Sequence, residues 1–411
     1  MMSNVPDIRF AGFTDPWEQR KLDELATFGG GHTPSMADDS NYLDGEILWV
    51  TSQDVKVDYL EDTTTKLSAK GAAELKLYPA GTLLMVTRSG ILRHTLPVSM
   101  LRKPSTVNQD IRTISTSDEC SSLWLMQYLK ARSKELLLEY GKTGTTVESV
   151  DFSKMQSMSL LLPKASEQGA IGDLFYQLDN LITLHQRKYD KLVVLKKALL
   201  DKMFPRDGSD VPEIRFAGFT DPWEQRKLGD YLELSTERNS ELRYGVEDVY
   251  SVSWTSGVVN QIEFQGRSFA GTDLSGYDVV HHNEVIYTKS PLRDEPFGII
   301  KTNHLTSGIV SQLYAVYQAS EECDPSFVET YFAQNTRLNN YFRPLVNKGA
   351  KNTMNISDEE SLTGPVTFPS AAEQRKIASL FSFLDDLITL HQRKLKLLKS
   401  VKTSLLEKMF V

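Results

Sequence analysis

Apolar residues recur every three or four positions in two long segments of the chain, with Lys, Arg, Gln and Asp between them. The apolar positions run from Ile171 to Met203 in the first segment and from Ile377 to Met409 in the second. This spacing places them on one face of a helix. Each segment therefore predicts a helix of about 33 residues, roughly 50 Å long at a rise of about 1.5 Å per residue. Because helices of this length with such a face commonly pack as coiled coils, we expect the two to pair with each other in antiparallel orientation.

One histidine falls within each apolar face, His185 in the first helix and His391 in the second. A polar residue at such a position can fix the register of a helix pair. A ligand site or a pH switch is the alternative. We expect the register role.

Short apolar runs broken by turn residues predict strands in the two stretches that lie outside these helices. The strands are expected at 46–51, 82–87, 249–254 and 284–288, with closing strands that end on proline at 159–163 and 366–369. A helical stretch precedes each closing strand, at 123–140 and 327–342. The two stretches therefore share an order of elements.

The chain also repeats itself. Residues 5–22 return as 211–228 with only Asp7 changed to Glu213, and residues 178–188 return as 384–394 with a single change, both at a shift of 206. The stretches between these copies have almost no identity to each other. A near-identical frame around two divergent inserts is the pattern of a scaffold that presents two different readers.

The predicted fold class is α+β, with two globular mixed α/β domains separated by two long antiparallel helices and related by a pseudo-twofold repeat. The expected segments are 1–22 (conserved), 23–163 (first insert), 164–205 (central helix), 206–228 (linker and conserved segment), 229–369 (second insert) and 370–411 (C-terminal helix). Under this symmetry, residues 5–22 should dock beside the end of the second helix, which brings the two ends of the chain together. The aromatic residues of the copied segment should pack there, and ligand binding is the alternative for Phe10, Phe13, Trp17, Phe216, Phe219 and Trp223.

Composition narrows the possible classes of protein. Hydrophobic residues make up 40% of the chain, and no apolar run approaches the roughly 20 residues of a membrane span. The first residues do not resemble a signal peptide, so we expect a cytoplasmic protein that does not enter a membrane. The two cysteines, Cys120 and Cys323, differ by 203 rather than 206, so they do not fall at equivalent positions and are expected to be inert thiols. A net charge of −8 argues against bulk attraction to nucleic acid but not against local basic surfaces.

Catalytic motifs are absent from the sequence. The segment Gly141-Lys142-Thr143 lacks the earlier glycine of a phosphate-binding loop, because residue 136 is Leu136. Gly29-Gly30-Gly31 is not a dinucleotide-binding pattern, and there is neither an HExxH motif nor a Pro-Pro pair. We therefore expect no catalytic residue, no cofactor and no metal in this chain.

Several strings in the inserts, together with the repeated helices, carry a family resemblance. They are GGGHTPS (29–35), YLDGEILWVTSQDV (42–55), VTRSGI (86–91), VNQDI (107–111), SVSWTSGVV (251–259), DLSGYDVVHHNEVIYTKSPLR (273–293), SGIVSQLYAVY (307–317) and the paired LD(N/D)LITLHQRK helices. In this order and in a repeated frame, they make the chain resemble the specificity (S) subunit of type I restriction–modification systems.

The resemblance implies a non-catalytic subunit for sequence-specific DNA recognition. Each insert would read one half of a bipartite asymmetric target, and the helices would span the unread spacer. The implied partners are double-stranded DNA, two modification (methyltransferase) subunits and restriction (translocase/nuclease) subunits. Adenine methylation or cleavage would be carried out by those partners, with S-adenosylmethionine, ATP and Mg on them. The alternative is a protein–protein scaffold with two ligand-binding inserts, which the net charge favours slightly.

Polar residues in loops beside the predicted strands are the candidates for DNA contact, because base edges and phosphates are bound mainly by Arg, Lys, Asn, Gln, Ser and Thr. In the first insert they are Ser52, Gln53, Arg88, Ser89, Arg93, Asn108, Gln109, Lys142 and Thr145. In the second insert they are Ser253, Thr255, Lys289, Ser290, Arg293, Arg343, Lys348 and Lys351. A solvated surface position is the alternative for each. VTRSGI and YTKSPLR are favoured, since a cation beside a hydroxyl follows a strand in both.

Overall fold

A computed structural model describes residues 5–144, 147–206, 208–291, 295–348 and 354–410. The chain divides into two compact units. Unit 1 comprises Met1–Arg187 and Gln392–Val411, and unit 2 comprises Lys188–His391. None of the helices in the described part of the chain is both long and apolar enough to cross a membrane.

The two predicted long helices are present and are longer than expected. Helix α6 spans Ala165–Lys202 and α10 spans Ala371–Lys408, which is 38 residues each. The additional residues lie at the N-terminal ends; in α6 they include Gly169, and Gly172 follows just inside the predicted segment. A Cβ atom at Gly172 would lie 2.9 Å from the Cβ of Leu123, so glycine here lets helix α3 (Ser122–Ala131) of the first insert approach α6 closely.

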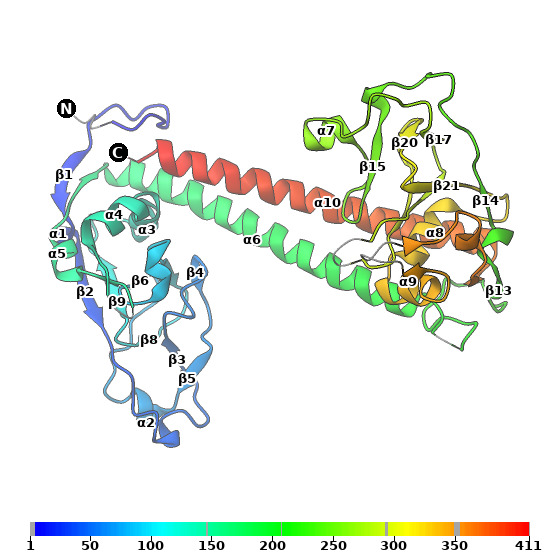
Figure 1. Ribbon diagram of the computed structural model, residues 1–411. Helices are drawn as coiled ribbons and strands as arrows, with labels where there is room; N and C mark the ends of the chain where they lie inside the picture. Colours follow the sequence, from blue (N-terminus) through cyan, green and yellow to red (C-terminus); the bar gives the residue numbers. More distant parts are fainter. Residues whose placement is uncertain (1–4, 145–146, 207, 292–294, 349–353, 411) are drawn as a thin grey trace. The chain divides into compact units, whose positions relative to one another are not determined.

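Within each unit the two long helices lie side by side and antiparallel (Figure 1). In unit 1, the rings of Phe175 and Phe410 are 5.8 Å apart, and in unit 2 those of Phe204 and Phe381 are 6.1 Å apart. The second pair is the first one shifted by the repeat distance of 206 residues. His185 and His391 are partly exposed on these helices, and their role in register stays a prediction.

The first insert contains a sheet with the strand order β2-β9-β6-β7-β4 and a smaller one with the order β5-β3-β8. Its strands are β2 (Ala26–Gly30), β3 (Ile47–Val50), β4 (Tyr59–Leu60), β5 (Thr65–Leu67), β6 (Leu83–Val86), β7 (Val98–Leu101), β8 (Thr106–Val107), β9 (Ile111–Thr116), β10 (Gly141–Lys142), β11 (Ser149–Val150) and β12 (Ser159–Leu162). Its helices are α1 (Leu22–Leu25), α2 (Ala69–Ala72), α3 (Ser122–Ala131), α4 (Ser133–Tyr140) and α5 (Phe152–Gln156).

The second insert repeats the central strand order without repeating the sequence. Its sheet runs β14-β21-β18-β19, which corresponds to β2-β9-β6-β7 in the first insert, and all these pairings are antiparallel. The strands are β14 (Leu232–Leu234), β15 (Tyr250–Ser253), β16 (Gly257–Asn260), β17 (Asp278–Val280), β18 (Val285–Thr288), β19 (Ile300–Thr302), β20 (Gly308–Val310), β21 (Tyr314–Ala319), β22 (Asn347–Lys348), β23 (Met354–Asn355) and β24 (Pro365–Phe368). The helices are α7 (Gln261–Gln265), α8 (Pro325–Phe332) and α9 (Asn335–Phe342).

Each late helical stretch is divided in two rather than continuous. Arg132 lies between α3 and α4 with φ −94° and ψ 11°, outside the helical range. The break lets the hydroxyl of Ser133 accept a hydrogen bond from the backbone N–H of Leu96 at 2.8 Å. In the second insert the break falls at Ala333 and Gln334.

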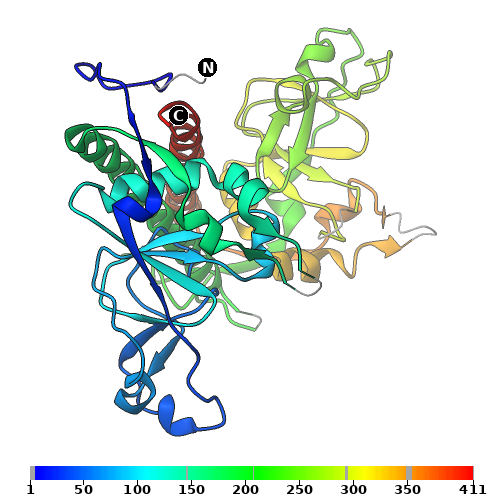
Figure 2. The same ribbon diagram turned by 90° about the vertical axis from the view of Figure 1, so that its left-hand side faces the viewer.

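The copied segment docks on the end of a long helix in both units. The N–H of Ile8 donates to the carbonyl of Lys408 at 3.0 Å, and that of Ile214 donates to Lys202 at 2.9 Å. The described ends of the chain are therefore adjacent in unit 1, as predicted (Figure 2). Trp17 is buried in the core of unit 1, and its copy Trp223 is buried in the core of unit 2.

We call the contact between the copied segment and the long helices of each unit the docking joint, and a polar strand completes it. β1 (Glu18–Lys21) pairs antiparallel with β12, and β13 (Glu224–Lys227) pairs in the same way with β24. Sequence reasoning missed both strands because their EQRK residues lack an apolar pattern.

An arginine and a glutamate lock each joint. Arg9 donates two hydrogen bonds to the buried carboxylate of Glu167, at 2.6 and 2.7 Å. Arg215 contacts Glu373 in the same way, at 2.8 and 2.7 Å. Because such bidentate pairs are geometrically specific, they fix the copied segment against the first turn of each long helix.

The two cysteines are equivalent in the structure, which corrects the inference from their spacing. Gln168 accepts a hydrogen bond from the backbone N–H of Ser121, the residue after Cys120, and its copy Gln374 accepts one from Asp324, the residue after Cys323. The inserts differ by three residues before this point, which displaces the sequence register. Burial raises the pKa of both thiols to about 12, so they stay protonated.

Candidate nucleic-acid interface

Loops that carry the predicted contact residues of the first insert leave the sheets at a common edge. Strands β3 and β8 are parallel, with Val50 opposite Val107, so the residues that follow them lie at the same end. Ser52 and Gln53 follow β3, and Asn108 and Gln109 follow β8. We call this end of unit 1 the loop edge.

The end of β6 and the β10–β11 hairpin join the same edge. The N–H of Thr87 donates to the carbonyl of Asp110 at 2.8 Å, and Arg88 forms a bridge with Ser149. Ser149 in turn pairs with Lys142 across the hairpin. The structure therefore brings together predicted residues from four separate loops.

Several of these polar side chains are occupied by contacts within the insert. Asn108 is buried, and its side chain bonds to the N–H and carboxylate of Asp110 at 3.0 and 3.3 Å. Asn108 therefore stabilises the turn that positions Gln109. Gln109 is exposed and accepts a hydrogen bond from the hydroxyl of Thr33 at 2.6 Å. Ser89 caps the short turn that follows it, through the N–H of Ile91 at 3.5 Å.

Two of the cations are paired with carboxylates. Arg93 pairs with Glu148, and Lys142 lies 2.8 Å from Asp151. These cations lower the pKa of Glu148 and of Asp151.

Arg88 is exposed like Arg93 and Lys142, but unlike them it has no ion-pair partner among the described residues. It is the cation of the loop edge with the most freedom to contact a phosphate or a base. Thr145 lies outside the described residues.

The second insert places a cation and a serine at the corresponding point of its sheet. Lys289 and Ser290 follow β18 just as Arg88 and Ser89 follow β6. Lys289 is paired with Asp358, at 2.7 Å. The two favoured segments of the sequence therefore occupy matching positions in sheets of matching order.

The other described candidates of the second insert lie in two further places. Ser253 and Thr255 share the turn between β15 and β16, with their hydroxyl oxygens 3.4 Å apart. The N–H of Val252 donates to the hydroxyl of Tyr314, and Tyr314 pairs with Thr288 next to Lys289, so this turn lies near the end of β18. Arg343 is exposed after α9, and Lys348 lies in β22. Arg293 and Lys351 lie outside the described residues.

Two residues near these loops were missed in the sequence. Arg112 is exposed in β9. Its guanidinium lies so close to Gly30 that a Cβ atom added there would be only 2.6 Å from the guanidinium nitrogen. Trp254 sits between Ser253 and Thr255, and the ammonium of Lys301 lies 5.5 Å from its ring centroid. The available signals were a charged residue alternating with buried ones in β9 and an aromatic residue between two hydroxyls in a hairpin turn.

A partly buried carboxylate supports the Trp254 region. Glu329 accepts hydrogen bonds from the ammonium of Lys301 at 3.0 Å and from the N–H of Thr302 at 2.9 Å. Burial opposes its ionisation, but His304, Lys301 and Thr302 outweigh that effect and lower the pKa of Glu329 to about 2. Glu329 in turn raises the pKa of His304.

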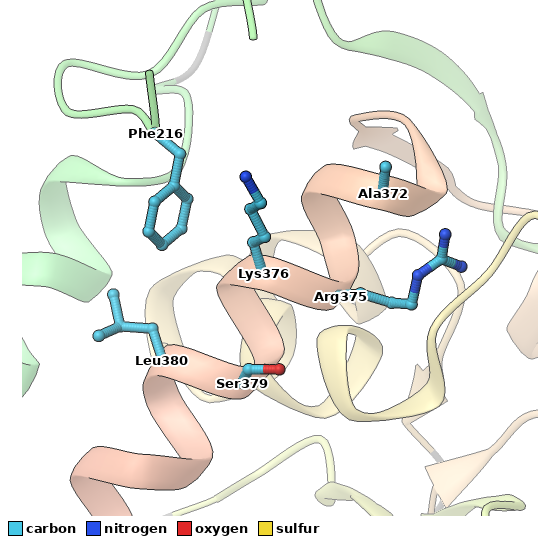
Figure 3. A pocket seen from close by; sticks show the side chains of 6 residues that line it. All are labelled: Phe216, Ala372, Arg375, Lys376, Ser379 and Leu380. Atoms are coloured by element: carbon cyan, nitrogen blue, oxygen red, sulfur yellow. The ribbon is translucent and has the colours of Figure 1, made fainter. Parts of the chain in front are cut away.

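A cavity of about 560 Å³ lies elsewhere in unit 2, over the first turns of α10 (Figure 3). Lys376 points toward Phe216, whereas Arg375 points away from it (Figure 3). The repeat places Gly169 and Ala170 of α6 at the positions of these two cations. Because this cavity has no basic counterpart in unit 1, it is not part of the shared interface.

Comparison with known proteins shows which family part of this chain resembles. Residues 14–193 match the family model described as the type I restriction modification DNA specificity domain. Residues 14–193 are thus similar to a type I specificity domain. The resemblance seen in the sequence is thereby confirmed.

Two curated specificity subunits match parts of the chain. The type I restriction enzyme EcoR124I/EcoR124II specificity subunit of Escherichia coli is 29% identical over 187 residues, which cover 42% of this chain and 46% of that protein. The type I restriction enzyme MjaIX specificity subunit of Methanocaldococcus jannaschii is 25% identical over 242 residues, which cover 55% and 54%. The chain thus spans about half the length of these relatives.

A solved structure shows the fold over the whole chain. The crystal structure of the type I restriction–modification system S subunit from M. genitalium matches with a TM-score of 0.65, covers 99% of both chains and is 13% identical. The predicted α+β fold class is confirmed.

Proposed function

We propose that this chain is the sequence-specific DNA recognition subunit of a type I restriction–modification complex, in which each insert reads one half of a bipartite asymmetric target. One observation carries the proposal. Two inserts without shared sequence have the same central strand order, and each places a cation and a serine at the end of the same strand. The same frame with different loops is what two readers of different half-targets require.

The proposed partners are double-stranded DNA, two modification subunits and restriction subunits. The docking joint is present once in each unit, with the same arginine–glutamate pair, which supports one modification subunit for each unit. Adenine methylation and cleavage belong to the partners, together with S-adenosylmethionine, ATP and Mg. The protein–protein scaffold is not favoured, because the matched domain is a DNA specificity domain.

Charge sets an expectation for DNA binding by the chain alone. Arg93, Lys142 and Lys289 are paired with carboxylates, and the net charge is −8. Binding that depends on phosphate neutralisation should therefore be weak and steeply salt-dependent without partner subunits. Tight binding by the isolated chain that is insensitive to salt would contradict this view.

Methylome sequencing tests the proposal. A host that expresses this chain with its modification subunits should methylate adenine in one split, asymmetric motif that is unmethylated in a host lacking the chain. Arg88→Ala and Lys289→Ala should each relax discrimination in a different half of that motif, because each cation belongs to a different insert. An unchanged methylome, together with no specific DNA binding by the assembled complex, would contradict the proposal.

A further inference from the structure

Four charged side chains form a cluster where the first insert meets the long helices in unit 1. Lys130 of α3 lies 2.5 Å from one oxygen of Asp58, and Lys402 of α10 lies 2.8 Å from the other. Lys402 also lies 2.5 Å from Asp179 of α6. Two cations and two carboxylates thus alternate along one chain of contacts.

The cluster is largely buried, and hydrogen bonds from two neighbouring side chains reach its most buried carboxylate, Asp179. The side chains of Asp179 and Lys402 are 5% and 15% exposed. The hydroxyl of Tyr59 and the amide of Gln127 donate to Asp179 at 3.3 and 3.2 Å. Buried ion pairs add little net stability compared with apolar packing, but each member demands its partner in a defined place.

Members of the cluster come from two sources. Asp58, Tyr59, Gln127 and Lys130 belong to the first insert. Asp179 and Lys402 belong to the long helices, that is, to the frame.

The frame repeats its own two residues in unit 2. A shift of 206 carries Asp179 to Asp385 and Lys402 to Lys196, and these also pair, at 2.5 Å. This second pair is much more exposed, at 53% for Asp385 and 26% for Lys196. Within the described part of unit 2, no charged side chain of the second insert joins it. The frame therefore offers the same Asp–Lys pair twice, and only the first insert is seen to engage it.

We propose that Asp58 and Lys130 are positioning residues that seat the first insert on the Asp179–Lys402 pair and so fix the aim of its loop edge. This inference rests on the proposed function, because it concerns how one half-target is read. In this cluster each carboxylate of one element faces a cation of another, so the charges balance. An insert shifted on the long helices would leave a buried charge unpaired, and the cluster therefore favours one orientation of the insert.

A pair of variants separates positioning from stability. Asp58→Asn leaves Lys130 buried without its carboxylate, so unit 1 should be destabilised. Asp58→Asn/Lys130→Met removes both insert charges and leaves the Asp179–Lys402 pair intact, so much of the stability should return. Lys196→Met breaks the exposed copy of the pair in unit 2 and is the matched control.

The experiment uses the full chain assembled with its modification subunits. Methylation rates are measured on the wild-type target and on targets altered at one base in either half, and thermal unfolding is followed in parallel. For the double variant we expect recovered stability but a roughly ten- to hundredfold loss of discrimination, because small misplacement of contact groups has effects of that size. The loss should be confined to the half that Arg88→Ala also affects, and Lys196→Met should leave both halves unchanged.

Two outcomes overturn different claims. A double variant that is stable and discriminates like the wild type would overturn the positioning role, while the proposed function would stand. A wild-type complex that methylates no split target would overturn the proposed function itself.

Discussion

The two docking joints are built from the same residues, yet the inserts attached to them are held differently. Both joints have an arginine–glutamate pair, a glutamine that bonds the turn before the late helices and a buried tryptophan. Beyond the joint, the first insert contributes two charges to a buried network on the long helices, whereas the Asp–Lys pair of unit 2 is exposed. The repeated frame thus determines where each insert is attached, whereas the residues of the insert itself determine how it is oriented on the long helices.

The copied joint gives the largest expected effect. Arg9→Ala leaves Glu167, which is 1% exposed, as an unpaired buried carboxylate, and the expected loss of unfolding free energy is about 4 kcal/mol. Arg215→Ala should cost unit 2 a similar amount, since Glu373 is equally buried. Denaturant unfolding of both variants measures this. Clearly unequal losses would show that the joints are copies in sequence only.

Substitutions in the Asp–Lys pairs of the long helices should affect the stability of the two units more unequally. Lys402→Met removes the partner of Asp179 and half the partners of Asp58, so a loss of about 3 kcal/mol is expected in unit 1. Lys196→Met should cost less than about 1 kcal/mol, because its pair is solvent-exposed. Thermal unfolding at low and high salt tests both. Equal losses would remove the distinction between a buried and an exposed pair.

Acid should destabilise unit 2 through Glu329. The folded pKa of Glu329 is lowered to about 2, so the stability it supplies is present above about pH 4.5 and is lost as the pH falls toward 2. The expected loss is roughly 2 kcal/mol. In unit 1, contacts with Lys130 and Lys402 overcome burial and lower the pKa of Asp58 to about 2, but burial raises the pKa of Asp179, and the two carboxyls respond to acid in opposite directions.

Glu329→Gln tests this prediction. The variant should be less stable than the wild type at neutral pH, and its unfolding free energy should fall less between pH 4.5 and pH 2. A pH dependence identical to that of the wild type would contradict the role of Glu329.

The smallest effect concerns one position of the long helices. Gly172 of α6 corresponds to Ala378 of α10, and a methyl group at Gly172 would come within 2.9 Å of Leu123. Gly172→Ala should therefore destabilise unit 1 by about 1 kcal/mol despite the better helix propensity of alanine, because the contact is already tight. Ala378→Gly should cost unit 2 about 1 kcal/mol through helix propensity. Circular dichroism melts measure both, and a stabilised Gly172→Ala variant would show that Leu123 can move.

The frame could be predicted from the sequence because its signals are local or repeated. The apolar faces predicted α6 and α10, and the copied segment predicted contacts such as that of Ile8 with Lys408. The splits at Arg132 and Ala333 could not be predicted, since they depend on packing against distant strands. The equivalence of the cysteines was hidden by a three-residue difference in insert length.

The sequence predicted which strands carry the candidate interface better than it predicted what each individual side chain contacts. Arg88 and Lys289 were found because both follow a strand and precede a serine. Asn108, by contrast, forms an Asx-type turn with Asp110, a local alternative that its spacing of two residues already allowed. The contact between Asp58 and Lys402 joins residues 344 apart, and no local pattern predicts it.

Retention of the Asp–Lys pair at both ends of the helices bears on how new target specificities arise. An insert that carries its own aspartate and buried lysine would find the same complementary pair at either position of the chain. An insert without them would leave that pair exposed, as the second insert does, at little cost in stability. If the inserts read half-targets as proposed, exchange of inserts between the two positions would let the number of readable targets grow as combinations of halves rather than one whole target at a time.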